Sequence, residues 1–239
     1  MKRNVAVGLG IVTVLALAGA AWFFSQGDAE PTTDVTAPPI ESSETTIGES
    51  DPVQSTAPAV SEQPTTFELT DATTATFRID EELRGSPKTV VGTSNVVLGQ
   101  IQIDRDDLAN SQIGEILINA RVFETDSALR NRAIRGPILD TDAFEFVSFE
   151  PTSIDRLEGI AEVGDELSFS ITGDLTIRDV TEPVTFEVTA TLTSDTTIEG
   201  SATTIVERGP FELAIPSVPT VANVSESVPL ELTFVAESA

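Results

Sequence analysis

Apolar and polar residues alternate strictly along two long stretches of the chain, residues 167–177 and 184–192. In the first stretch the odd positions hold apolar residues and one glycine, while serine, threonine and aspartate fill the even positions. A period of two indicates β-strands with one buried face and one solvated face. The link between them, residues 178–183, is short enough to predict a hairpin.

Shorter alternating stretches predict further strands. They lie at residues 77–79, 101–103, 116–122, 144–154, 197–206 and 228–234. With the two long stretches they give about eight strands, and one buried face per strand indicates an antiparallel sheet. Strands of about 35 Å, at roughly 3.3 Å per residue, favour a closed barrel, which leaves no exposed edge. We therefore predict an all-β fold, an antiparallel eight-stranded barrel.

One segment departs from the period of two and predicts a single short helix. Asp126 is a suitable N-cap for a helix over residues 127–135, and Gly136 with Pro137 would end it. The apolar side of this helix would consist of Leu129, Ala133 and Ile134.

The N-terminus predicts a membrane anchor. Residues 5–24 carry no charge and are long enough to cross a hydrocarbon core of about 30 Å. Because Lys2 and Arg3 precede this run, the rest of the chain is expected outside the cytoplasm. A cleaved signal peptide is the competing interpretation, since residues 18–20 resemble a cleavage site. The run continues to Phe24, which favours an uncleaved anchor over residues 1–24. Both interpretations place the domain in the periplasm or at the cell exterior.

The next segment, residues 25–66, is rich in proline, serine, threonine and acids and has almost no large apolar residue. Such a composition cannot bury enough surface to offset the entropy of ordering. We expect a disordered linker that acts as a stalk, and a folded domain over residues 67–239.

Composition excludes several classes of function. The chain contains no cysteine and no histidine, which excludes thiol nucleophiles, thiolate metal sites and a Ser-His-Asp triad. Its net charge of −26 repels nucleic acid. The acidic run at residues 104–107 lacks the glycine and distant glutamate of a calcium-binding loop. We predict a protein that is not an enzyme and has no cofactor or metal site.

Residues 173–184, with the sequence GDLTIRDVTEPV, closely resemble the signature hairpin of the YceI-like family, although Asp179 stands where that family usually has glycine. Residues 125–135 resemble the family's threonine-led helix, with Ala133 in place of its histidine. Weaker likenesses occur at residues 99–104, 144–152 and 206–211. The resemblance covers residues 67–239 and implies a lipocalin-like barrel that binds a polyisoprenoid or similar amphiphile in its interior.

The predicted inward-facing side chains are suited to such a ligand because they carry no polar atoms. They are Phe77, Ile101, Ile118, Phe169, Ile171, Phe186, Val188, Leu232 and Phe234. An eight-stranded barrel is wide enough either to hold one slender ligand or to be filled by its own side chains. Two functions follow. The first is lipid binding for storage or transport, and the second is a membrane-anchored structural or interaction domain with a filled core.

A cluster of basic residues on the predicted helix is a candidate head-group site. Arg130, Arg132 and Arg135 could meet a pyrophosphate or carboxylate at the barrel mouth, or they could form a solvated helix face. The expected partners are thus a long-chain isoprenoid and, through the N-terminal helix, the membrane. The sequence leaves open whether the domain forms a homodimer.

Overall fold

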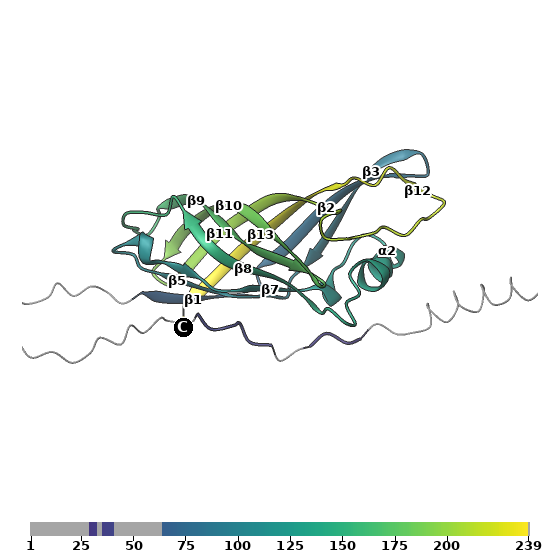
Figure 1. Ribbon diagram of the computed structural model, residues 1–239. Helices are drawn as coiled ribbons and strands as arrows, with labels where there is room; N and C mark the ends of the chain where they lie inside the picture. Colours follow the sequence, from purple (N-terminus) through teal and green to yellow (C-terminus); the bar gives the residue numbers. More distant parts are fainter. Residues whose placement is uncertain (1–28, 33–34, 41–63, 239) are drawn as a thin grey trace, which may run out of the picture.

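The structure, a computed structural model, describes residues 29–32, 35–40 and 64–238. Thirteen strands in these residues form one strongly curled antiparallel sheet, a half-barrel, with the short helix α2 (Ala128–Ala133) at one end (Figure 1). Eight of these strands are five or more residues long. The predicted all-β antiparallel fold with one short helix is therefore confirmed, but in place of the predicted closed barrel of eight strands the described residues form a half-barrel of thirteen.

The alternating stretches of the sequence fall in the strands of this sheet. The longer strands are β1 (Thr65–Leu69), β2 (Thr74–Leu83), β3 (Ser86–Ser94), β8 (Phe146–Asp155), β9 (Glu166–Ile177), β10 (Val180–Ser194), β11 (Thr197–Glu207) and β13 (Ser227–Ser238). The shorter strands are β4 (Val97–Leu98), β5 (Gln100–Ile103), β6 (Gln112–Ile113), β7 (Ile116–Asn119) and β12 (Val221–Ala222). Single helical turns occur at η1 (Leu108–Asn110), η2 (Ala120–Val122) and η3 (Ile134–Ile138).

The curl of the sheet follows from its pairing. Strands β7, β8, β9, β10, β11 and β13 are successive antiparallel neighbours. The first half of β13 pairs with β2, with Leu230 opposite Phe77, and its second half pairs with β1. Strand β2 pairs with β3, and β4, which follows β3, pairs with β7 through Val97 and Ile118. The strands at the start of the domain therefore meet those at its middle, and the sheet wraps around its own apolar face.

Two local predictions differ from the structure. The hairpin between β9 and β10 turns over Arg178 and Asp179 alone, and Arg178 adopts a positive φ of 59°. The pairing of Val180 with Ile177 begins the second strand four residues before its predicted start at residue 184. The alternation at residues 116–122 does not form one strand, because β7 ends at Asn119, whose side chain caps the turn η2.

The helix prediction was wrong at both ends. The N-cap is Ser127, while the Asp126 carboxylate instead accepts hydrogen bonds from Lys88 and Arg130. Gly136 and Pro137 do not end the helical path, because the π-type turn η3 continues through them to Ile138. Of the expected apolar side, Ile134 is 6% exposed and packs near Phe77 and Phe123, but Leu129 is 77% exposed.

Glycines let phenylalanine rings lie close to the strands. Phe234 on β13 is paired with Gly200 on β11, and a Cβ atom at Gly200 would lie 2.6 Å from the ring. Phe77 lies in the same way against Gly92, its partner on β3. A side chain at either glycine would push the ring inward, so these positions set how much interior space remains.

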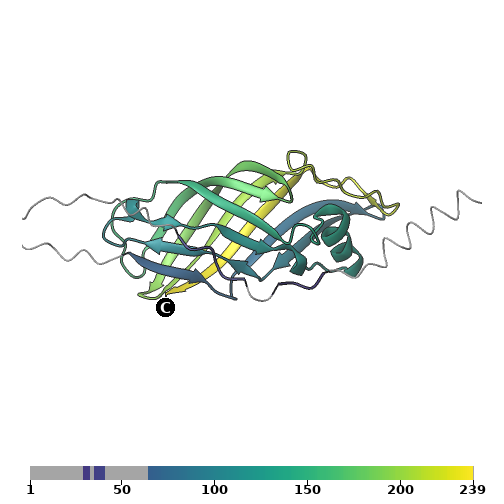
Figure 2. The ribbon, with the colours of Figure 1, turned by 60° about the horizontal axis from the view of Figure 1, so that its bottom comes forward.

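The predicted anchor, residues 1–24, lies outside the described residues, and within the described ranges no helix is long and apolar enough to cross a membrane. The boundaries of the predicted linker also stay a prediction, although β1 begins at Thr65, inside it. Two pieces of the linker, residues 29–32 and 35–40, are described, and they lie along the outside of the sheet (Figures 1 and 2). We call these two pieces the strap.

Candidate functional site: an apolar cavity inside the curled sheet

The inner face of the sheet encloses a cavity of about 640 Å³. This volume falls within the range of about 300–1,000 Å³ that is typical of small-molecule sites. Most of the side chains that line the cavity are aliphatic or aromatic. All nine residues predicted to face inward line it: Phe77, Ile101, Ile118, Phe169, Ile171, Phe186, Val188, Leu232 and Phe234. The parity of the alternating stretches thus identified one continuous wall.

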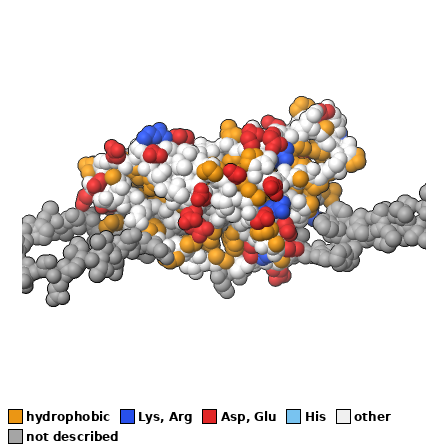
Figure 3. All heavy atoms as spheres, viewed as in Figure 1, with side chains coloured by type: hydrophobic (Ala, Val, Ile, Leu, Met, Phe, Trp, Pro, Cys, Tyr) orange, Lys and Arg blue, Asp and Glu red, His pale blue; other side chains and the backbone are white. Residues whose placement is uncertain are grey.

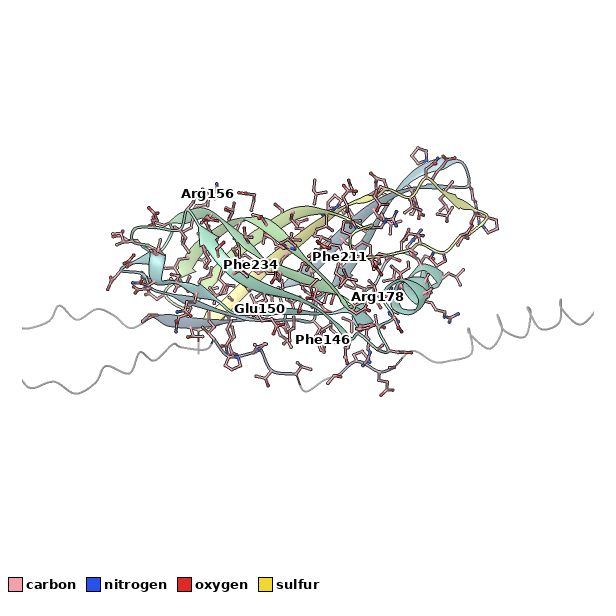
Figure 4. All side chains as sticks on the ribbon, in the orientation of Figure 1. Phe146, Glu150, Arg156, Arg178, Phe211 and Phe234 are labelled. Atoms are coloured by element: carbon pink, nitrogen blue, oxygen red, sulfur yellow. The ribbon has the colours of Figure 1, made fainter. Side chains whose placement is uncertain are left out.

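Phenylalanine rings from different strands organise this wall. Phe149 on β8 and Phe186 on β10 pack edge to face, with ring centroids 5.0 Å apart. Phe77 makes a similar contact with Phe123, at 5.4 Å, which ties the sheet to the segment leading into α2. Figure 4 labels Phe234 within the curl of the sheet, and it lines the cavity. Edge-to-face pairs fix the rings in place, so the cavity is bounded by ordered side chains.

Among the residues that line the cavity, the exposed ones all lie at the α2 end of the sheet. They are Arg84, Asp126, Leu129, Glu207, Val218 and Thr220. They come from the β2–β3 turn, from α2 and the residue before its cap, and from the end of β11 with the long loop that follows it. We call this end the mouth. Sequence reasoning missed the loop over residues 213–224, because its prolines and small residues follow no period.

The opposite end of the cavity is covered. Leu157 and Ala161 line it there and are 8% and 6% exposed. The loop that carries them is held by two backbone hydrogen bonds, from the Leu108 N–H to the Gly159 carbonyl at 2.8 Å and from the Ala161 N–H to the Arg105 carbonyl at 3.0 Å. A ligand would therefore enter through the mouth.

The charged residues on the cavity wall balance one another. They are Glu81, Arg84, Lys88, Asp126, Arg130, Glu207, Arg208 and Glu231. Arg130 is bound by two carboxylates, that of Glu81 at 2.8 Å and that of Asp126 at 2.5 Å. The hydrogen bond from Lys88, together with the nearby charges, lowers the pKa of Asp126 below its ordinary value despite some desolvation. Asp126 thus stays ionised and neutralises the arginine.

The structure does not bring the three predicted head-group arginines together at the cavity. Arg130 lines it, but Arg132 is exposed on α2 and is not part of the wall. Arg135 faces a second, smaller pocket beside the strap and donates to the Phe123 carbonyl at 3.4 Å. Arg132 is two positions from Arg130, a spacing that puts them on different faces of the helix, and Arg135 is five positions away, within the π-type turn.

The strap is held by a cluster of polar residues outside the cavity. The Thr32 N–H and hydroxyl both donate to the Glu145 carboxylate, each at 2.7 Å. Arg121 forms an ion pair with Glu145 at 2.5 Å and donates to the Glu30 carbonyl at 3.1 Å. Further along, the Ile40 side chain lies against Gly114. Nothing in the sequence signals these contacts, because Thr32 sits in a low-complexity segment.

Glu145 is the group whose ionisation controls the first of these contacts. Burial raises the pKa of this carboxyl, but the hydrogen bonds from Thr32 and Asn119 and the charge of Arg121 outweigh burial. The net pKa of Glu145 lies below its ordinary value of 4.5. The ionised form is therefore the one that binds the strap.

We expect acidification to release the strap at Thr32. Because the folded pKa of Glu145 is lowered, the stabilisation is present above the ordinary pKa and is lost as pH falls through the folded one. Hydrogen exchange of the Thr32 amide, corrected for its intrinsic rate, should show protection at pH 6 that is lost only as the pH falls through the lowered pKa of Glu145. The Leu69 amide, bonded to the Gly99 carbonyl at 3.0 Å, is the control, because no titrating group accepts its hydrogen bond. Equal loss of protection at both amides would contradict the assignment.

Comparison with known proteins agrees with the geometry. Residues 66–236 match the family model described as the YceI-like domain. None of the curated proteins matches the chain in sequence. Among solved structures, a polyisoprenoid-binding domain from Saccharophagus degradans, implicated in plant cell wall breakdown, aligns with a TM-score of 0.57 at 12% identity, covering 74% of this chain and 100% of that one. BcnA of Burkholderia cenocepacia aligns with a TM-score of 0.51 at 18% identity, covering 67% and 95%. At these identities the structures show a shared fold.

Proposed function

Because this chain belongs to the YceI-like family, we propose that its cavity binds an isoprenoid-type or other long amphiphilic lipid outside the cytoplasm, for storage or transport. The observation that carries the proposal is the apolar cavity of about 640 Å³ with one accessible end. The alternative function, a structural or interaction domain, was expected to have a filled core, and a filled core would leave no such space. A similarly folded protein, the Saccharophagus degradans domain, is described as polyisoprenoid-binding, which supports this ligand class.

The polar end of the ligand is proposed to be uncharged. Arg130 already has two carboxylate partners. Arg208 donates to the carbonyls of Ser225 and Leu213, at 2.8 and 2.9 Å, and forms an ion pair with Glu226 at 2.8 Å. An anionic head group that bound Arg130 or Arg208 would have to replace these partners and would meet the remaining carboxylates of the mouth. A hydroxyl or carbonyl end could hydrogen-bond at the mouth without that cost.

For the location of the domain we rely on the predicted anchor, and we propose that residues 1–24 hold the domain at the outer side of the membrane. The proposed role is binding without catalysis, in line with a family of binding domains.

A lipid extract of the purified full chain, analysed by mass spectrometry, tests the proposal. We expect an uncharged isoprenoid-type lipid at near-stoichiometric amount, enriched over its share of the total membrane extract. The same extract from an Ala202→Trp variant, whose indole would occupy part of the cavity, is the control and should lack the enrichment. Extracts of equal composition would favour a structural or interaction domain.

A further inference from the structure

The mouth of the cavity carries an uncharged, largely apolar loop on an otherwise acidic chain. Residues 213–224 carry no charged side chain, although the chain as a whole has 39 acids and 13 bases. Six apolar residues of this loop line the cavity: Leu213, Ile215, Pro216, Val218, Val221 and Val224. Opposite them Leu129 of α2 is 77% exposed, and Val218 is 44% exposed. Figure 3 shows hydrophobic side chains at this end of the molecule, where β3 and β12 project.

The charges around this apolar rim do not oppose contact with a lipid surface. Four bases and four acids lie on the cavity wall, so the charges that line the cavity sum to zero while the net charge of the chain is −26. The outer surface shown in Figure 3 carries many more acids than bases. A balanced apolar rim tolerates the interface of a bilayer, whereas the acidic sides of the sheet would be repelled by anionic lipids.

The strap brings the N-terminal part of the chain to the same end. Its first piece lies beside α2 and its second piece runs toward β1 (Figures 1 and 2). The Ala29 N–H donates to the Asp142 carboxylate at 3.0 Å, just after the turn that follows α2. Thr32 and Glu30 are held by Glu145 and Arg121, as described above.

The chain between the predicted anchor and the strap is short. The uncharged run ends at Phe24, five residues before Ala29. Even fully extended, five residues reach only about 18 Å. An anchor in the bilayer therefore keeps the α2 end of the domain close to the lipid surface, in contrast to a free stalk of the whole predicted linker.

We propose that the mouth docks on the bilayer to which the chain is anchored, with Leu129 and the loop 213–224 in contact with the lipid. The strap fixes this orientation. The inference rests on the proposed function and on the proposed anchor. An apolar ligand then passes between the bilayer and the cavity without crossing water. The lipid surface is the partner because it is the one apolar phase within reach of the anchored mouth.

Site-specific labels test this docking, since the chain has no cysteine and a single introduced one is unique. Leu129→Cys and Val218→Cys report on the mouth, and Ile160→Cys, at a residue 66% exposed by the covered end, is the matched control. Each full-length variant carries a nitrobenzoxadiazole label and is reconstituted in phosphatidylcholine vesicles containing nitroxide-labelled phosphatidylcholine. We expect at least twofold stronger quenching at positions 129 and 218 than at 160. Equal quenching at the three positions, or none at the mouth, would overturn the docking.

The strap is tested in the Val218→Cys background. Thr32→Pro removes both the N–H and the hydroxyl that bind Glu145. Thr36→Pro, at an exposed residue without a hydrogen bond to the described part of the chain, is its control. We expect quenching at position 218 to fall with Thr32→Pro and to stay with Thr36→Pro. Unchanged quenching in both would overturn the role of the strap.

Binding of a fluorescent polyprenol by the unlabelled full chain, in which Leu129 and Val218 are unchanged, separates this inference from the proposed function. Polyprenol binding without quenching at the mouth would leave the proposed function standing and refute the docking. Quenching at the mouth without polyprenol binding would support the docking and refute lipid binding in the cavity.

Discussion

Replacing Ala202 with tryptophan should abolish binding of a polyprenol while leaving the fold intact. Ala202 lies on β11 between Val188 of β10 and Leu232 of β13, and all three line the cavity. An indole there would occupy space that the ligand needs. If it excludes about 110 Å² of ligand surface, at roughly 25 cal/mol per Å², the loss is about 2.8 kcal/mol. That loss corresponds to about a hundredfold weaker affinity.

The matched control lies on the same strand. Ile205 is 67% exposed and faces away from the cavity, so Ile205→Trp should leave the affinity unchanged. Fluorescence titration with a polyprenol gives both affinities, and near-ultraviolet circular dichroism confirms that the variants are folded. A folded Ala202→Trp protein that binds as tightly as the parent would show that the ligand, if any, binds elsewhere.

The wall of the cavity could be predicted from sequence because a strand has a strict geometric rule. Side chains alternate between the two faces, so the parity of a few residues assigns every other residue of that strand. Phe169 and Val188 lie on neighbouring strands and are directly paired in the structure, as their parity requires. The same rule does not predict whether the interior is hollow or filled. That depends on how far the sheet curls and on where phenylalanine rings lie against glycines such as Gly200.

The mouth could not be predicted for a different reason. Its loop and its arginine partners depend on contacts between segments far apart in the chain, such as Arg130 with Glu81. A basic cluster on a short helix looks like an anion site until its acidic neighbours are known. In a chain with 39 acids such neighbours are common, and here two carboxylates form ion pairs with Arg130, which the sequence suggested as a head-group ligand.

The strap shows the limit of composition as a guide to order. Residues 25–66 have the composition of a disordered linker. Yet a segment needs only a few well-placed partners to dock, and Glu145 accepts two hydrogen bonds from one threonine, Thr32. These bonds depend on a carboxylate that the pairing with Arg121 holds in place. Because the strap is bound to the domain, only the residues between the predicted anchor and Ala29 separate the two. The position of the anchor therefore affects the orientation of the cavity.

The hollow interior also predicts how unevenly the core responds to truncation. Phe67 of β1 is fully buried and does not line the cavity, so Phe67→Ala should lower the free energy of unfolding by about 3–5 kcal/mol. Phe169 is 7% exposed but borders the cavity, and atoms that face a void have fewer contacts to lose. Phe169→Ala should therefore cost only about 2 kcal/mol in delipidated protein.

Urea unfolding of the two variants measures this difference directly. Adding a saturating polyprenol should stabilise the parent more than Phe169→Ala, because the ring that contacts the ligand is missing and stabilisation by a ligand follows its affinity. Phe67→Ala should gain as much from the ligand as the parent does. If both substitutions cost the same and neither protein gains stability from the polyprenol, the interior is packed in solution. The structural or interaction domain would then be the function to pursue.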